Sequence, residues 1–335
     1  MTAPGQIEFH EVDKPTPRDN EVVMETQRIG VCGSDIHVYH GMHPYTGYPV
    51  VQGHEVGGVV SAVGSYVTHV KVGDKITFMP QVTCGKCYPC THGMNNICES
   101  LKVMGFQTGG AAQEYFALPA ENVLKLPDSM SVDEAAFVEP LSVTVHALKR
   151  GGGVERKRVL VLGAGPIGNL TAQVAKASGA SAVMITDISP YKLDKARKCG
   201  IDFVVDSTTE KLGDAILRNF GPGKADLILE CVGVEATMTD AILNARKGTT
   251  IVVVGVFGKK PQVDLGLVQD RELNLVGTLM YQKADYERAI ELLAAGKINM
   301  REMITHRFPF DQYLGAYHAI EALHGEYLKV MIDLT

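Results

Sequence analysis

The sequence lacks the features that would assign it to a membrane, a secretory pathway or a nucleic acid. Its longest apolar run, around Ile251 to Phe257, is far too short to span a bilayer. It has no excess of basic residues, since 32 Lys and Arg stand against 38 Asp and Glu, which argues against nucleic acid as a partner. The first residues, Met1 to Gly5, contain neither a basic head nor an apolar stretch, so we expect no signal peptide. We therefore expect a cytoplasmic protein with neither a membrane nor a nucleic-acid partner.

The composition is that of a soluble globular chain. Hydrophobic residues make up 45% of the 335 residues and charged residues 21%, and this length is sufficient for two domains with large cores. The chain has seven cysteines, an odd number, and four of them fall between Cys84 and Cys98. This clustering predicts a metal site in a reducing compartment and argues against a disulfide framework.

The stretch from Cys32 to Glu55 offers a thiolate, an imidazole and a carboxylate, which are the ligand types that zinc prefers. Cys32 and His54 stand among glycines, including Gly33 and Gly53, without apolar periodicity around them. Such glycines are typical of tight turns or close packing beside a site. The alternative is a buried cysteine and a core histidine that never meet. We predict a metal site here.

A second group of cysteines follows the spacing C-x2-C-x2-C-x7-C. Four thiolates this close together can surround a tetrahedral zinc ion, and they leave no coordination position for a substrate. A four-iron cluster also uses C-x2-C-x2-C, but it usually continues with a short gap and Cys-Pro. Disulfides are the other alternative. We predict a structural zinc site, with these ligands: Cys84, Cys87, Cys90 and Cys98.

The first 125 residues have the pattern of a β-rich, irregular domain. Ile7 and Phe9 alternate with polar residues and predict a short strand, and the valine-rich stretch 53–82 predicts further strands. Ser131, followed by acidic residues, then predicts the start of a helix. That helix carries Glu139 before a proline in an otherwise apolar run, where an unpaired carboxylate is costly to bury. A metal or cation nearby would explain Glu139; an exposed Glu at a helix kink is the alternative.

From residue 158 the pattern changes to alternating strands and helices. The continuous apolar run 159–162 predicts a parallel strand buried on both faces, and a glycine-rich turn and a helix follow it. The next strand, 182–186, ends at Asp187, nineteen residues after the last glycine of the turn. This is the dinucleotide-binding fingerprint in its full context, so we predict that the helix N-terminus binds the pyrophosphate and Asp187 the adenosine ribose. The turn consists of Gly163, Ala164, Gly165, Pro166, Ile167 and Gly168.

The alternation continues to about residue 285 and predicts a doubly wound sheet. The expected strands are 203–205, 227–229, 250–254 and 273–276, and the expected helices are 192–198, 213–219, 238–246 and 285–295. The strand-like run 328–334 is expected to return to the first domain. We therefore predict a NAD-binding Rossmann domain over 150–285, inserted in a catalytic zinc-binding domain formed by 1–149 and 286–335.

Taken together, these motifs resemble the zinc-dependent medium-chain dehydrogenases, and among them the sorbitol (polyol) dehydrogenase group. The resemblance covers nearly the whole chain. It implies an α/β fold, with a doubly wound Rossmann sheet inserted in a β-rich, GroES-like catalytic domain and the active site in the cleft between them. It rests on the segments 31–37 and 53–55, the four-cysteine lobe, 139–143 and 163–168.

The resemblance also implies roles for individual residues. Cys32 and His54 match the catalytic zinc ligands, and the further protein ligand is either Glu55 or Glu139, because family members differ here. The other carboxylate can contact the zinc-bound water instead. Ser34 and His37 match a relay that carries the proton from the substrate hydroxyl through the nicotinamide ribose to solvent. Lys192 matches a cation beside the adenosine ribose. The segments flanking the nicotinamide would contain Val232, Val254, Gly255, Val256, Leu279, Met280 and Tyr281.

Two departures from the family pattern stand out. Most of the usual first strand is missing before Gly5, so the edge of the catalytic domain is expected to be built differently. Met280 stands where sorbitol dehydrogenases tend to carry an arginine that touches substrate, although Tyr281 is retained. The departure at Met280 puts sorbitol itself in doubt as the substrate.

The function implied is a zinc-containing oxidoreductase that transfers a hydride from a secondary alcohol of a polyol, sugar alcohol or sugar acid to NAD+. Threonine, butanediol and polyol phosphate remain as other substrates. A non-catalytic redox sensor on the same fold is a different class, but a sensor has no need of a proton relay. A zinc-free quinone reductase would lack the cysteine lobe. We expect NAD to be preferred over NADP because of Asp187, and a homo-oligomer, a dimer or a tetramer.

Overall fold

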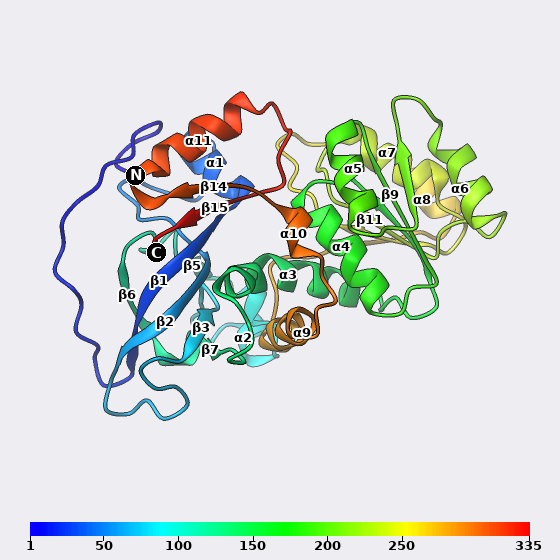
Figure 1. The fold of residues 1–335 in the computed structure, drawn as a ribbon. Coiled ribbons are helices and arrows are strands. Elements are labelled where there is room, and N and C mark those ends of the chain that lie inside the picture. The colour runs from blue at the N-terminus through cyan, green and yellow to red at the C-terminus, as the bar shows by residue number, and fades with distance from the viewer.

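The computed structural model describes all 335 residues and contains two large sheets at opposite ends of the molecule (Figure 1). The first sheet has seven strands in the order β14-β15-β1-β2-β3-β7, with β6 also paired to β1. Its pairings are antiparallel except that of β14 with β15. The strands are β1 (Glu21–Val31), β2 (Glu55–Val63), β3 (Lys75–Phe78), β6 (Tyr115–Pro119), β7 (Val123–Lys125), β14 (Ile304–Pro309) and β15 (Lys329–Asp333).

The first sheet joins the two ends of the chain. Strand β15 pairs antiparallel with β1, from Arg28 opposite Asp333 to Val31 opposite Val330. The strand predicted at 328–334 is therefore present and lies beside the strand that leads to Cys32. Short elements surround this sheet: α1 (Gly33–Tyr39), β4 (Gln81–Val82), α2 (Tyr88–Thr91), η1 (Asn95–Ile97), β5 (Lys102–Val103), η2 (Ala120–Asn122), α10 (Met300–Met303), η3 (Phe310–Gln312) and α11 (Tyr313–Ala322).

The second sheet is wholly parallel and has the order β10-β9-β8-β11-β12-β13. In chain order this is 3-2-1-4-5-6, the doubly wound arrangement that binds dinucleotides where the order reverses, here between β8 and β11. The predicted fold class is confirmed. The elements are β8 (Arg158–Leu162), α4 (Pro166–Ala177), β9 (Ala182–Asp187), α5 (Pro190–Lys198), β10 (Phe203–Asp206), α6 (Leu212–Phe220), β11 (Leu227–Glu230), α7 (Glu235–Asn244), β12 (Thr250–Val253), α8 (Leu265–Asp270) and β13 (Asn274–Gly277).

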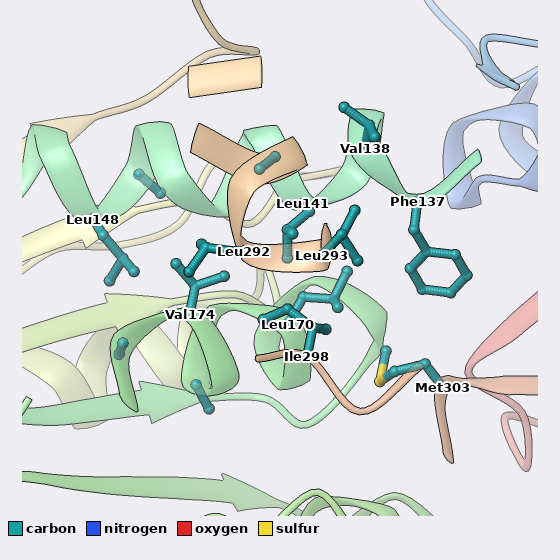
Figure 2. Close-up of a cluster of buried hydrophobic side chains, with 14 of the residues drawn as sticks. Phe137, Val138, Leu141, Leu148, Leu170, Val174, Leu292, Leu293, Ile298 and Met303 are labelled. Atoms are coloured by element: carbon teal, nitrogen blue, oxygen red, sulfur yellow. The ribbon is translucent and has the colours of Figure 1, made fainter. Parts of the chain in front are cut away.

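Helix α3 (Val132–Arg150) connects the two sheets. Ser131 caps it, accepting the backbone N–H of Glu134, as the sequence predicted. Figure 2 shows Leu141 and Leu148 of α3 packing with side chains of α4 and α9 (Lys283–Ala294) in the largest buried cluster. The helix continues through its internal proline and buries Glu139 with 7% of the residue exposed, so the alternative of an exposed Glu at a kink is wrong.

The strand predicted around Ile7 and Phe9 is wrong. Residues 7–18 form no strand, and half of Phe9 is exposed while its ring packs edge-on against Phe310. Alternation of apolar and polar residues describes a half-buried surface, but a strand also needs a neighbour for its backbone hydrogen bonds.

No helix in the structure has the length and apolar character needed to cross a bilayer.

Candidate active site and metal centres

The mixed ligand group predicted from the sequence lies where β1 ends and β2 begins. Cys32 follows β1 and His54 precedes β2, and the register of the two strands places Gly30 opposite Glu55. The ligand atoms of Cys32, His54 and Glu55 all lie within 4.8 Å of one another. A side chain at Gly30 would not fit, since its Cβ would lie 2.3 Å from Glu55 Oε2. This donor set of sulfur, nitrogen and oxygen fits a zinc ion.

Asp35 orients this group, although the sequence reasoning assigned it no role. Its buried carboxylate accepts the backbone N–H of Cys32 at 2.9 Å, and its Oδ1 lies 3.5 Å from His54 Nδ1. Burial lowers the pKa of His54, but the charge of Asp35 and the nearby Cys32 outweigh burial and hold that pKa well above its usual value. A carboxylate is a usual second partner of a metal-binding histidine. It holds the imidazole ring in one orientation and raises the basicity of the ring.

Lys329 was also missed, and it neutralises Glu55. Its Nζ donates to Glu55 Oε1 at 2.7 Å and Oε2 at 2.5 Å, and both residues are at most 3% exposed. Burial lowers the pKa of Lys329, but the Glu55 carboxylate outweighs it and leaves that pKa raised. The available signal was a lysine inside the apolar run 328–334, which is costly to bury without a partner.

Glu139 lies outside the group of mutually close ligand atoms, but the charges of His54 and Glu55 act on its carboxyl group. Burial raises the pKa of the Glu139 carboxyl to about 7, His54 opposes this and Glu55 adds to it. The buried hydroxyl of Tyr281 donates to Glu139 Oε1 at 2.7 Å. The two predicted carboxylates therefore have different protein partners, Lys329 for Glu55 and Tyr281 for Glu139.

The residues of the predicted relay lie on helix α1. Ser34 is half-buried and His37 is exposed. A third imidazole that the sequence reasoning missed, His43, stacks on Phe106 with ring centroids 4.9 Å apart, and Phe106 in turn lies 4.8 Å from the ring of His54. Burial, with help from His37, lowers the pKa of His43.

The four-cysteine lobe forms as its spacing predicted. The sulfur atoms of its four cysteines lie within 4.8 Å of one another, and none forms a disulfide. Backbone N–H groups of Lys86 and Cys87 lower the pKa of Cys84 to about 6, whereas burial and neighbouring thiols raise that of Cys90 to about 12. Such an all-sulfur tetrad fits a closed zinc site.

The glycine turn between β8 and α4 has the shape that a pyrophosphate requires. A side chain at Gly168 would collide with the Gly163 carbonyl, its Cβ only 1.8 Å from that oxygen, whereas the space around Gly165 is open. Asp187 ends β9, and its Oδ2 accepts the backbone N–H of Ala164 at 2.7 Å. A hydrogen bond thus joins the glycine turn to Asp187, the residue predicted to bind the ribose. Lys192 is half-buried in α5.

Two of the predicted nicotinamide segments, at Val232 and at 254–256, come together where β11 and β12 end, and the third, 279–281, follows β13. Glu230, buried and not anticipated, accepts the N–H groups of Val232 and Gly233, each at 2.9 Å. Gly233 packs against Gly255 so closely that a Cβ at Gly255 would lie 2.2 Å from Gly233 nitrogen. Of the predicted contacts, Val232, Val256 and Leu279 are exposed, Val254, Gly255 and Met280 are half-buried, and Tyr281 is fully buried.

Known proteins share this architecture over the whole chain. A model of the alcohol dehydrogenase GroES-like domain matches residues 18–128, and one of zinc-binding dehydrogenases matches 166–295. Sorbitol dehydrogenase of Halalkalibacterium halodurans is 34% identical, with 98% of this chain and 96% of that protein aligned. L-galactonate-5-dehydrogenase of Escherichia coli is 31% identical, covering 98% and 96%.

Solved structures agree. An Escherichia coli alcohol dehydrogenase complexed with NADH has a TM-score of 0.91 and 31% identity, covering 99% of this chain and 97% of that one. A Sinorhizobium meliloti structure bound to NADP has a TM-score of 0.90 and 29% identity, covering 98% and 96%. The chain therefore belongs to the zinc-binding medium-chain dehydrogenases, in their sorbitol dehydrogenase-like group.

Proposed function

We propose that the chain is a zinc-dependent dehydrogenase that transfers a hydride from a secondary alcohol of a polyol, sugar alcohol or sugar acid to NAD+, giving a ketone. The observation that carries this proposal is the mixed ligand group of Cys32, His54 and Glu55, within 4.8 Å, in a chain that also has the dinucleotide turn. The sorbitol and galactonate dehydrogenases to which the chain is similar support the substrate class.

Cys32 and His54 would bind the catalytic zinc, with Glu55 or Glu139 as the further ligand. When bound, zinc acts as a Lewis acid on the substrate oxygen and favours the alkoxide near neutral pH. The chain's own residues prepare the two carboxylates for different tasks. Lys329 binds both oxygens of Glu55, whereas Tyr281 donates to one oxygen of Glu139. We infer that Glu139 is the carboxylate more available to a cation, because no lysine or arginine forms an ion pair with it, whereas Lys329 does so with Glu55.

Ser34 and His37 would carry the proton away from the substrate hydroxyl. Ser34 is half-buried two residues after Cys32, and His37 follows one turn later at the surface. This order from interior to solvent is what a relay needs, and an imidazole is a suitable group to pass the proton to solvent. The nicotinamide ribose would connect the substrate to Ser34.

The turn of Gly163 to Gly168 would bind the pyrophosphate, and Asp187 the adenosine ribose, with Lys192 beside it. NAD is expected to be preferred over NADP, because a 2′-phosphate would bring like charge against Asp187. Residues 188–191 contain no arginine to neutralise it. Lys195 follows in the same helix, but its Nζ already donates to Glu302 at 2.9 Å and so does not neutralise a 2′-phosphate. Lys192 is then the one nearby cation that would favour NADP.

The same proposal covers the organisation of the chain. Residues 1–149 and 286–335 would form the catalytic domain and 150–285 the nucleotide-binding domain, with one zinc ion catalytic and the other structural. Val232, the segment 254–256 and the segment 279–281 would flank the nicotinamide. We further infer a cytoplasmic homo-oligomer, a dimer or a tetramer, that acts on a small alcohol.

The test measures how fast zinc-loaded protein forms NADH from NAD, or NADPH from NADP. The alcohols tested are polyols, aldonates, threonine, simple diols and polyol phosphates. We expect the highest kcat/KM for a polyol or aldonate with NAD. Asp187→Ala should weaken NAD binding and narrow the preference over NADP. Tight NADH binding without turnover of any alcohol would favour the redox sensor, and an equal or higher kcat/KM with NADP would remove Asp187 as the selector.

A further inference from the structure

We propose that Asn96, inside the four-cysteine lobe, is a positioning residue that fixes the backbone of segment 279–282 beside the nicotinamide and the catalytic zinc centre. The inference rests on the proposed function for its kinetic consequence, but not for its structural one. It gives the lobe a second task, which is to set the geometry of a segment of the other half of the molecule.

The first observation is a buried amide between the lobe and that segment. Asn96 lies between Cys90 and Cys98 in η1 and is 5% exposed. Its Nδ2 donates to the Leu279 carbonyl at 2.9 Å and lies 3.4 Å from His146 Nε2. Asn95, its neighbour in the same short helix, is exposed and forms no side-chain hydrogen bond.

Asn96 lies next to a further buried pair, His146 and Asp285, and its amide has one orientation. His146 Nδ1 lies 2.7 Å from Asp285 Oδ2, and both residues are buried. Burial raises the pKa of Asp285, but hydrogen bonds from His146 and the Gln282 backbone outweigh burial and lower it, so the carboxylate is ionised and only accepts. The Leu279 carbonyl can only accept a hydrogen bond, so the Asn96 nitrogen must face it, and this places the same nitrogen 3.4 Å from His146 Nε2.

Further bonds from the first half of the chain fix the same segment. Gln81 Nε2 donates to the Tyr281 carbonyl at 2.8 Å, and Gln282 Nε2 donates to the carbonyl of Gly93 in the lobe at 2.8 Å. Met280, which lies between Leu279 and Tyr281, has φ +49°, a left-handed conformation that residues other than glycine rarely adopt. Such a conformation persists only where its surroundings determine it, and here the neighbouring carbonyls on both sides are bound.

The segment runs from the end of the parallel sheet to Glu139 of helix α3. Leu279, two residues after β13, is exposed, and the Tyr281 hydroxyl donates to Glu139. Glu139 and His146 lie seven residues apart on α3, about two turns, so one helix face contacts Tyr281 through Glu139 and Asn96 through His146. Loss of the Asn96 bond is expected to free the Leu279 carbonyl and to shift Leu279 and Tyr281 together.

The test compares Asn96→Ala with Asn95→Ala as the matched control. Hydrogen–deuterium exchange is followed at the Gln282 amide, which donates to Asp285 Oδ2 at 2.9 Å. We expect about tenfold faster exchange in Asn96→Ala and wild-type exchange in Asn95→Ala, with the same zinc content in both. In turnover assays Asn96→Ala should raise KM for NAD and lower kcat, each several-fold.

Gln81→Met provides a second, independent variant, because it removes the donor to Tyr281 and keeps a side chain of similar length. If Asn96→Ala does not fold, Gln81→Met should show the same faster exchange at Gln282 and the same kinetic change. Wild-type exchange in a folded Asn96→Ala, or a lower melting temperature with unchanged kinetics and exchange, would overturn the proposal. A wild-type enzyme that oxidises no alcohol would contradict the proposed function, while the exchange result would still decide the role of Asn96.

Discussion

The two candidate metal centres of this molecule are built in opposite ways. The four-cysteine lobe takes all its ligands from 84–98, and three of its four cysteines are partly exposed. The mixed centre takes Cys32, His54 and Glu55 from the ends of β1 and β2 and places buried charges around them. A local cluster needs only the right spacing, whereas a buried mixed centre also needs partners for every charge that it removes from water.

These partners come from distant parts of the chain. Lys329 reaches Glu55 from the last strand, and Tyr281 reaches Glu139 from the end of the parallel sheet. The lobe has no such partners; its thiols interact with backbone N–H groups and with one another. The comparison predicts that mutations of the lobe's cysteines affect mainly stability, while mutations at the mixed centre affect mainly chemistry and charge.

The largest expected difference is between Cys32→Ala and Cys90→Ala. A catalytic metal is worth several kcal/mol of transition-state stabilisation, so Cys32→Ala should lower kcat/KM on the order of 10³-fold or more, with the melting temperature nearly unchanged. Cys90→Ala should instead lower the melting temperature, since structural zinc contributes folding energy. Metal analysis should find two zinc ions in the wild type and one in each variant, with chelators removing the catalytic ion first. Active wild-type protein with one zinc or none would contradict the two-site model.

Lys329→Met tests the buried charge pair of the mixed centre. Removing one partner of a buried ion pair costs roughly 3–5 kcal/mol, because the other charge stays buried without compensation. The free energy of unfolding in urea should fall by about that amount, while Lys329→Met combined with Glu55→Gln should regain a large part of it. Lys125→Met is the matched control, since Lys125 pairs with Asp74 while its own side chain is 44% exposed. Equal losses for the two lysines would show that burial is not the reason.

His37→Ala tests the path from the mixed centre to solvent. A general base typically contributes roughly 10²–10⁴-fold, and we expect the lower end, on the order of 10², at low pH and less at high pH, where hydroxide replaces it. Small exogenous bases such as imidazole should restore part of the rate. His92→Ala is the control, because His92 is an exposed histidine of the lobe. A pH–rate profile identical to the wild type would exclude His37 from the relay.

The smallest expected effect is the pH dependence of metal binding through Glu139. Its carboxyl has a pKa raised to about 7 by burial, so it is ionised above that pH and takes up a proton as the pH falls through it. Because a proton and a cation compete for the carboxylate, protonation of Glu139 should weaken zinc affinity about tenfold when the pH is lowered from 8 to 6. Zinc affinity is measured by competition with a chelator for the wild type and for Glu139→Gln. The ratio of the two affinities cancels the protonation of the other ligands, because they titrate in both proteins. A ratio that does not change with pH would exclude Glu139 as a ligand.

Spacing along the chain determined part of this protein by itself. The four-cysteine lobe, the glycine turn before α4 and the Ser131 cap each depend on residues close in sequence, where backbone geometry sets the distances. The alternating strands and helices likewise predicted the doubly wound sheet. The same local reasoning failed at Ile7 and Phe9, because the alternation there has no neighbouring strand to pair with.

Only the tertiary structure decided how the buried charges and amides are paired. Lys329 meets Glu55 because β15 pairs with β1 in one register, and Asn96 meets Leu279 because the lobe lies against the end of the parallel sheet. A sequence shows that such a group is costly to bury, but not which distant residue compensates it. That choice depends on strand register and on helix α3, which fix positions that are hundreds of residues apart within a few ångströms of one another.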